Sequence, residues 1–89
     1  MDIAKDSELL KALGHPIRLQ LVTGLMDNEC NVNDIVVKLN LPQSTISQHL
    51  GILRTRGIIA PHKEGVRTCY KVVDPRIKHI ISSLTNHSQ

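Results

Sequence analysis

Residues 41–53 read Leu-Pro-Gln-Ser-Thr-Ile-Ser-Gln-His-Leu-Gly-Ile-Leu, and this stretch decides the fold class. At about 100° per residue, Ile46, Leu50 and Leu53 fall on one stripe, which predicts a helix with one buried face. The opposite face is polar, short-chained and uncharged, with Ser44, Gln48, Gly51 and Thr55 flanked by Thr45 and Ser47. Such side chains suit close approach to the edges of DNA bases. The stretch therefore predicts the second helix of a helix-turn-helix.

The charge distribution favours this DNA interpretation. The net charge is +3. Residues 1–42 hold four basic and six acidic side chains, whereas residues 43–71 hold five basic side chains against Glu64 alone. Positive charge on and just after the proposed recognition helix is typical of a surface that contacts phosphates. The alternative is an ordinary polar helix whose hydroxyls serve as N-terminal caps.

Composition limits the chain to one small domain over residues 1–89, with a core of Ile, Leu and Val because Phe and Trp are absent. No apolar run approaches the about 20 residues needed to span a membrane. Charged residues also interrupt any N-terminal signal sequence. The chain is therefore expected in the cytoplasm, where its two cysteines are expected as thiols rather than as a constitutive disulfide.

Three amphipathic helices are predicted before the recognition helix. The first is short, covers residues 6–13 and is capped by Asp6 or Ser7. A Gly-His-Pro break then restarts a helix at Pro16. The third follows the N-cap candidate Asn31, and its short connection to the recognition helix predicts a helix-turn-helix over residues 32–56.

The pattern changes after Gly57. Residues 58–60 and 68–73 are typical of strands around a turn at residues 63–66, which predicts a hairpin, or wing, over residues 57–73. A last helix is expected over residues 75–85, and its apolar stripe has no obvious partner within so small a domain. The predicted fold is mainly α with a small β-hairpin: a winged helix-turn-helix of four helices, two strands and a final helix.

Several stretches resemble the ArsR/SmtB family of bacterial winged-helix repressors: residues 10–19, 41–50, 53–54, 57–59 and 69–72. The resemblance covers nearly the whole chain and is nearest to the smaller, metal-independent members. It implies a homodimer, built on helices 6–13 and 75–85, that binds a palindromic operator and represses transcription. The expected dimer contacts are Leu9, Leu10, Ile77, Ile80, Ile81 and Leu84.

The chain departs from the metal-sensing patterns of that family. One type carries Cys-Val-Cys where this chain has Asn31-Val32-Asn33, so the thiolate ligands are absent. Another type binds zinc on the last helix, where Asp74 and His87 match but Arg76 replaces a histidine. A zinc site needs four ligands. The sequence therefore predicts no metal and no cofactor, and it identifies no inducer.

Cys30 and Cys69 form a candidate thiol switch. The segment before the third helix of a winged helix commonly runs beside the wing, which would bring the two residues together. The alternative is a pair of small, inert side chains. His49, at the edge of the recognition helix, likewise has two interpretations, because it can pack or touch a phosphate.

Other function classes fit less well. Ser44, His49 and Asp34 superficially offer a nucleophile, a base and a carboxylate, but no nucleophile elbow or glycine-rich loop is present. A winged helix used as a protein-interaction module is the remaining rival, and Ile52 at the edge of the polar face suits it. The small polar face with basic flanks favours DNA.

The sequence thus predicts a homodimeric transcriptional repressor that binds double-stranded DNA. It predicts no enzymatic activity and no membrane contact. Two-fold symmetry places its half-sites about 10 base pairs apart or a multiple of that. The residues expected at the DNA are Gln43, Ser44, Thr45, Ser47 and Gln48 in the groove, Arg54, Lys63 and Arg67 on the backbone, and His49 if it contacts a phosphate.

Overall fold

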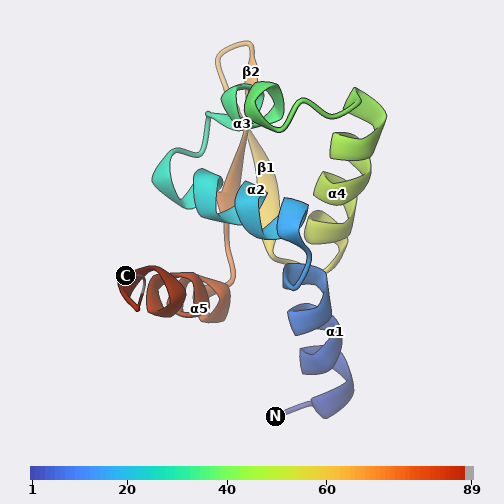
Figure 1. The fold of residues 1–89 in the computed structure, drawn as a ribbon, viewed down its shortest axis with the longest axis vertical. Coiled ribbons are helices and arrows are strands. Elements are labelled where there is room, and N and C mark those ends of the chain that lie inside the picture. Colours follow the sequence, from blue (N-terminus) through green and yellow to red (C-terminus); the bar gives the residue numbers. More distant parts are fainter. Residues whose placement is uncertain (88–89) are drawn as a thin grey trace.

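The chain folds as four helices, a hairpin and a final helix, in the predicted order (Figure 1). The computed structural model describes residues 1–87. Its elements are α1 (Ile3–Leu13), α2 (Pro16–Asp27), α3 (Val32–Leu39), α4 (Gln43–Thr55), β1 (Ile59–Glu64), β2 (Arg67–Val72) and α5 (Pro75–Asn86). Among residues 1–87, no helix has the length and apolar character needed to cross a membrane. The predicted fold class is confirmed.

Helix α1 begins earlier than residues 6–13 predicted. The carboxylate of Asp2 accepts a hydrogen bond from the backbone N–H of Lys5 at 3.0 Å, so Asp2 is the N-cap. The capping role assigned to Asp6 or Ser7 is wrong, because the Ser7 hydroxyl donates to the carbonyl of Ile3, as a serine inside a helix does. The extra turn brings Asp6 within reach of α5.

The helix-turn-helix is formed by α3, α4 and the connection between them. Asn40 ends α3 with φ of 52°, a left-handed conformation that asparagine tolerates better than most residues. Pro42 then takes the N-cap position of α4. Asn31 precedes α3 as predicted, but its side-chain amide donates to the carbonyl of Gly24 on α2 at 3.1 Å instead of capping α3.

The wing is an antiparallel hairpin that pairs Ile59 with Val72 at its base and Glu64 with Arg67 at its tip. Strand β1 runs on to Glu64, so the turn is shorter than the predicted residues 63–66. Gly65, with φ of 64°, supplies the left-handed conformation that a tight turn requires. On its other side β2 receives the loop after α2, because the Tyr70 N–H donates to the carbonyl of Glu29 at 2.8 Å.

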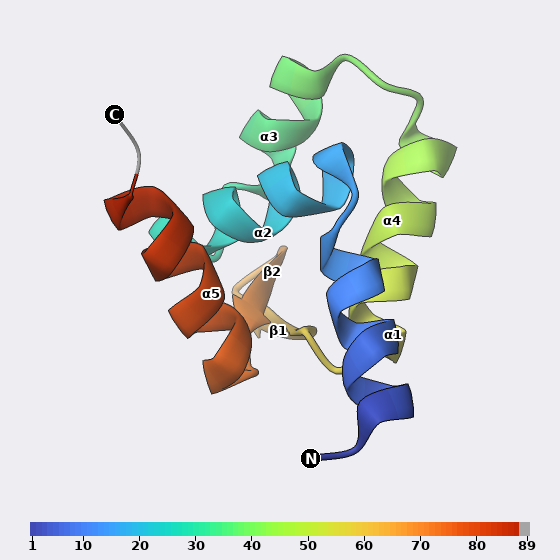
Figure 2. The ribbon, with the colours of Figure 1, turned by 60° about the horizontal axis from the view of Figure 1, so that its bottom comes forward.

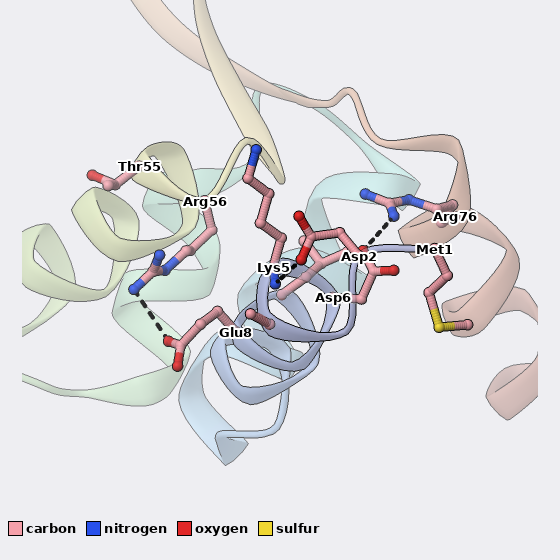
Figure 3. Close-up of a pocket in the computed structure, with 10 residues that line it drawn as sticks. Met1, Asp2, Lys5, Asp6, Glu8, Thr55, Arg56 and Arg76 are labelled. Carbon is pink, nitrogen blue, oxygen red and sulfur yellow. Dashed lines mark hydrogen bonds and ion pairs between the residues drawn. The ribbon is translucent and has the colours of Figure 1, made fainter.

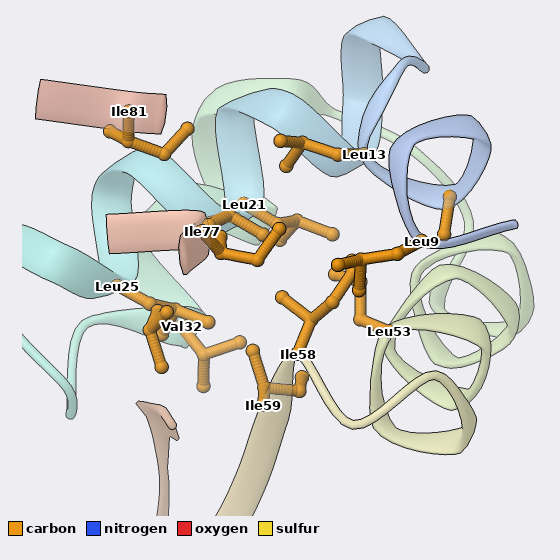
Figure 4. Packing of buried hydrophobic residues seen from close by; sticks show 13 residues of the cluster. Leu9, Leu13, Leu21, Leu25, Val32, Leu53, Ile58, Ile59, Ile77 and Ile81 are labelled. Atoms are coloured by element: carbon orange, nitrogen blue, oxygen red, sulfur yellow. The ribbon is translucent and has the colours of Figure 1, made fainter. Parts of the chain in front are cut away.

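The core is aliphatic and lies where α1, α2, α4, α5 and the base of the wing meet (Figure 4). Leu21, Leu25, Leu53 and Ile58 are fully buried there. Each such side chain contributes about 1.5–3 kcal/mol by leaving water. Figure 2 shows that α1 and α5 flank this core on opposite sides.

The core corrects part of the predicted dimer interface. Leu9, Ile77 and Ile81 are buried in their own chain, with exposed fractions of 7%, 0% and 4%. They leave little surface for a second copy to cover, and the apolar stripe of the last helix does have a partner within its own chain: the core that α2 and the base of the wing complete. Leu10 and Leu84 remain exposed, and Ile80 is half-buried.

Candidate nucleic-acid interface

Helix α4 presents its polar face to solvent and its apolar face to the protein. Ile46 and Leu53 are fully buried, and Leu50 is half-buried. This burial follows the predicted stripe and fixes the rotation of the helix. The predicted contact residues Gln43, Ser44, Ser47 and Gln48 are exposed, and Thr45 is half-buried.

The start of α4 leaves backbone donors uncapped. Its N-cap is Pro42, which provides no side-chain hydrogen bond to the first turn. The N–H of Thr45 donates to the Pro42 carbonyl at 3.0 Å, whereas the N–H groups of Gln43 and Ser44 come before the first helical hydrogen bond and lie at the positive end of the helix dipole. They therefore favour an anionic oxygen, as a DNA phosphate would supply.

A groove of about 270 Å³ separates α4 from the wing. Its lining comprises Gln43, Ser47, Leu50, Gly51, Arg54 and Tyr70. Three of these are predicted contact residues, so the structure brings Gln43, Ser47 and Arg54 to one surface. Tyr70 was missed in the sequence, where it reads only as one residue of a strand; its place beside α4 arises from the way the wing folds back.

The cationic residues of this surface are free of acidic partners. Within residues 1–87, no ion pair involves Arg54, Lys63 or Arg67. The ammonium of Lys63 donates only to the hydroxyl of its cross-strand neighbour Thr68, at 3.2 Å. Lys63 and Arg67 flank the wing tip, at the end of the molecule opposite to α1 and α5 (Figure 1). Their charge is available to phosphates.

His49 packs against the protein, so its placement among the DNA contacts needs correction. Its ring centroid lies 4.6 Å from that of His15, the N-cap residue of α2. Its Nδ1 lies 3.3 Å from Nη1 of Arg18. The pKa of His49 is lowered, first because burial disfavours the charged ring, and further by the charges of His15 and Arg18. The ring therefore helps to fix the orientation of α4 against the start of α2.

A second hollow, of about 680 Å³, lies between α1, the end of α4 and the start of α5 (Figure 3). Its charges already satisfy one another, because Arg56 pairs with Glu8 at 3.2 Å and Arg76 pairs with Asp6 at 3.0 Å. The hollow is larger than the groove beside α4, but it lies away from the wing tip and offers no free cluster of one sign. The cations that have no acidic partner among residues 1–87 therefore lie on α4 and the wing and not at this hollow.

The residues of the incomplete zinc pattern are engaged in helix capping. The Asp74 carboxylate caps α5 by accepting from the Arg76 N–H at 2.9 Å, and it also accepts from the Arg76 guanidinium. The guanidinium hydrogen bond is the main reason why the pKa of Asp74 is lowered. Within residues 1–87, no three His, Cys, Asp or Glu side chains are grouped so that they could hold a metal ion.

The structure joins Cys30 and Cys69 by a disulfide, with 4.4 Å between their Cα atoms. This spacing is at the short end of the range found for disulfides. The expectation of two separate thiols rested on the cellular compartment alone. The loop after α2 runs beside β2, and this proximity makes the bond geometrically accessible.

Residues 15–60 match the family model of bacterial regulatory proteins of the arsR family. The transcriptional repressor PagR of Bacillus anthracis is 38% identical over 85 residues, which cover 94% of this chain and 85% of that protein. The regulator MJ1325 of Methanocaldococcus jannaschii is 44% identical over 78 residues, 86% of this chain and 88% of that protein.

Solved structures agree with these sequence matches. The reduced form of HlyU from Vibrio cholerae superimposes with a TM-score of 0.84 at 37% identity, covering 97% of this chain and 92% of that chain. The crystal structure of PagR gives a TM-score of 0.78 at 37% identity, over 92% of this chain and 94% of that chain. The chain is a winged helix-turn-helix transcription regulator and belongs to the arsR family of bacterial regulatory proteins.

Proposed function

We propose that the chain is a homodimeric repressor that reads a palindromic operator with α4 and holds the DNA backbone with the wing. The observation that carries this proposal is the exposed, uncharged face of α4, opposite the buried Ile46 and Leu53 and flanked by cations that pair with no acidic side chain among residues 1–87. A face of this kind can enter the major groove without a desolvated charge.

The division of roles follows from side-chain reach. Gln48 and Ser47 project from the middle of α4, where they meet base edges, while Gln43, Ser44 and Thr45 lie at its first turn beside the uncapped N–H groups. Arg54 sits at the end of α4, and Lys63 and Arg67 on the wing. Cations at such separated points grip phosphates on either side of a groove. Tyr70 of the wing extends this set, because it lines the groove between the two elements.

Dimerisation is proposed through α1 and α5. Ile3, Leu10 and Leu84 expose 68%, 54% and 56% of their surface, all at the end of the molecule away from the wing tip. A second copy would cover these side chains and leave both α4 helices free. The two recognition helices then meet half-sites about one helical turn apart, or a multiple of that.

Repression in the cytoplasm, without an enzymatic step, is the mode of action that we propose. The similarity to PagR, which is named a transcriptional repressor, supports repression over activation. HlyU of V. cholerae is named a transcriptional activator, so the sign is a separate question from DNA binding. A reporter gene placed behind the operator answers it.

The experiment that tests DNA binding is a selection from random duplexes of about 30 base pairs, followed by affinity measurements on the recovered sequence. The expected result is a two-fold symmetric motif that Gln48→Ala recognises less selectively. A second variant, Arg67→Ala, should weaken binding to all duplexes. Its matched control is Lys78→Ala, which removes an exposed positive charge from α5 instead of the wing. Recovery of no motif, with equal affinity for selected and random duplexes, would contradict the proposal and favour a protein partner.

A further inference from the structure

We propose that the Cys30–Cys69 disulfide is a redox-controlled joint between the helix-turn-helix and the wing, that a dithiol reductant opens it, and that opening it weakens DNA binding. The proposal rests on the DNA-binding function proposed above and adds a means of regulating the same surface.

The bond connects two parts of the proposed DNA-binding surface. Cys30 lies directly before Asn31, the N-cap residue of α3, which is the first helix of the helix-turn-helix. Cys69 lies in the middle of β2, opposite His62 of β1. The two cysteines are 39 positions apart in sequence. The bond therefore ties the position of the wing to the position of α3.

The core anchors the base of the wing and, farther along β2, contacts Tyr70. Ile59 and Val72, which pair at that base, belong to the main apolar cluster. Cys69 is fully buried but is not among the buried residues of that cluster within the described chain. The disulfide thus adds a covalent anchor on β2, between the base of the wing and its tip, and we expect the core to keep the fold in place when the bond opens.

Two non-covalent contacts run beside the bond. The Tyr70 N–H donates to the Glu29 carbonyl at 2.8 Å, and Nε2 of His62 lies 2.9 Å from the Glu29 carboxylate. The side chains of the ion pair are 33% and 44% exposed, so water weakens their attraction. These contacts keep the loop near β2 after reduction but allow it more motion than a covalent bond does.

The joint lies next to the groove that faces DNA. Tyr70 follows Cys69 directly and lines the groove with Gln43 and Arg54 of α4. A wing held in place presents Tyr70, Lys63 and Arg67 without further ordering. A looser wing must be ordered when DNA binds, and that ordering lowers affinity.

The two cysteines differ in burial, and this difference sets the expected order of the chemistry. Cys30 is half-buried, whereas Cys69 is fully buried. A thiolate of the reductant attacks Sγ of Cys30, forming a mixed disulfide, and Cys69 leaves with the electron pair and takes up a proton. The second thiol of the reductant then attacks the reductant's sulfur atom in the mixed disulfide, and Cys30 leaves as a thiol. Two electrons and two protons pass to the protein, and the reductant becomes a cyclic disulfide.

The test compares oxidised and reduced protein on one duplex, the sequence recovered by the selection described above. Alkylation and mass measurement confirm the thiol state of each sample. The expected result is that reduction weakens binding by about fivefold and speeds hydrogen exchange in residues 66–71. Affinities within about twofold of each other, or tighter binding by the reduced form, would overturn the proposal.

The control is the double variant Cys30→Ser/Cys69→Ala, which should match the reduced protein whether or not reductant is present. If reductant changes the affinity of this variant, the effect on the native protein does not come from the disulfide. If oxidised native protein shows no preference for the selected duplex, the DNA-binding proposal fails by itself. Hydrogen exchange still tests the disulfide proposal in that case. If reduction does not change exchange in β2, the bond does not hold the wing in place, whatever the protein does with DNA.

Discussion

The imidazole rings of His15 and His49 lie 4.6 Å apart, so the break before α2 packs directly against the recognition helix. Nδ1 of His15 accepts the N–H of Ile17, and Nδ1 of His49 accepts from Arg18, since an arginine only donates. The guanidinium of Arg18 also donates to the carbonyl of Ala12 in α1. This cluster joins α1, α2 and α4.

Acid should destabilise this cluster. The folded chain disfavours protonated His49, whose pKa is lowered, so the unfolded chain binds this proton more tightly. The contribution to stability is therefore complete above the ordinary histidine pKa of about 6.5 and is lost as the pH falls below it. Urea midpoints measured from about pH 8 to about pH 5 should fall more for the native chain than for His49→Gln. Parallel losses in both proteins would show that other groups dominate.

Gln48→Ala and Arg67→Ala should separate base reading from backbone contact. Gln48 lies exposed on the face of α4, and its removal should cost about 1–3 kcal/mol on the selected operator and little on random DNA. Arg67→Ala should weaken both duplexes alike and reduce the salt slope by about 1. Fluorescence anisotropy across salt concentrations gives both quantities. Similar behaviour of the two variants would mean that the roles are wrongly assigned.

The same substitution at two glycines should have opposite effects on stability. A Cβ at Gly24 would lie 2.5 Å from Cδ1 and 3.1 Å from Cγ1 of Ile35, so Gly24→Ala displaces the half-buried Ile35 side chain from its packing against α2 and should cost about 1 kcal/mol. At Gly51, within α4, a Cβ meets no atom of the described residues within 4 Å. Gly51→Ala should therefore stabilise the helix by about 0.5–1 kcal/mol. Thermal unfolding of the two variants makes the comparison, and a stabilising Gly24→Ala would refute the tight packing.

Reduction of the disulfide should lower the free energy of unfolding. The cysteines are 39 positions apart, and in the chain-entropy model closing a loop of that size stabilises the folded state by about 4 kcal/mol. Urea unfolding with and without a dithiol reductant measures the difference. The variant Cys30→Ser/Cys69→Ala should unfold at one midpoint in both conditions. A midpoint of the native chain that does not move would show that the bond leaves the unfolded ensemble unchanged.

Leu84→Glu should shift the chain toward monomer. Leu84 is 56% exposed on α5, in the surface proposed to meet a second copy, where a buried carboxylate without a partner is costly. Val66→Glu is the control, because Val66 is 99% exposed at the wing tip, far from α5. Sedimentation at micromolar concentration should show monomer for the first variant and dimer for the second. If the native chain is itself a monomer, the dimer proposal fails.

The helix-turn-helix was predictable from residues close together in the chain. The apolar spacing of Ile46, Leu50 and Leu53 predicted which face of α4 is buried, because helix geometry relates sequence position directly to direction in space. The groove with Tyr70 was not predictable in this way. Tyr70 and Gln43 line the same groove because the hairpin returns toward α4, and no local sequence pattern encodes that arrangement.

The prediction for the last helix was wrong in part, for the same reason. Its apolar spacing was read correctly, but Ile77 and Ile81 fill the chain's own core instead of a dimer interface. Periodicity indicates that a face is buried and does not identify the surface that covers it. Helix α1 begins earlier than expected because its N-cap is Asp2, which lies four residues before Asp6, the earlier of the two predicted caps.

The sequence by itself determined the order of the elements, the polar face of α4 and the concentration of positive charge from Arg54 to Lys71, since these depend on local periodicity and composition. Only the tertiary structure decided that Cys30 is bonded to Cys69, that His49 packs on His15, and which apolar residues stay exposed. Each of these depends on segments that are distant in the chain, and their contact is set by how the whole core packs.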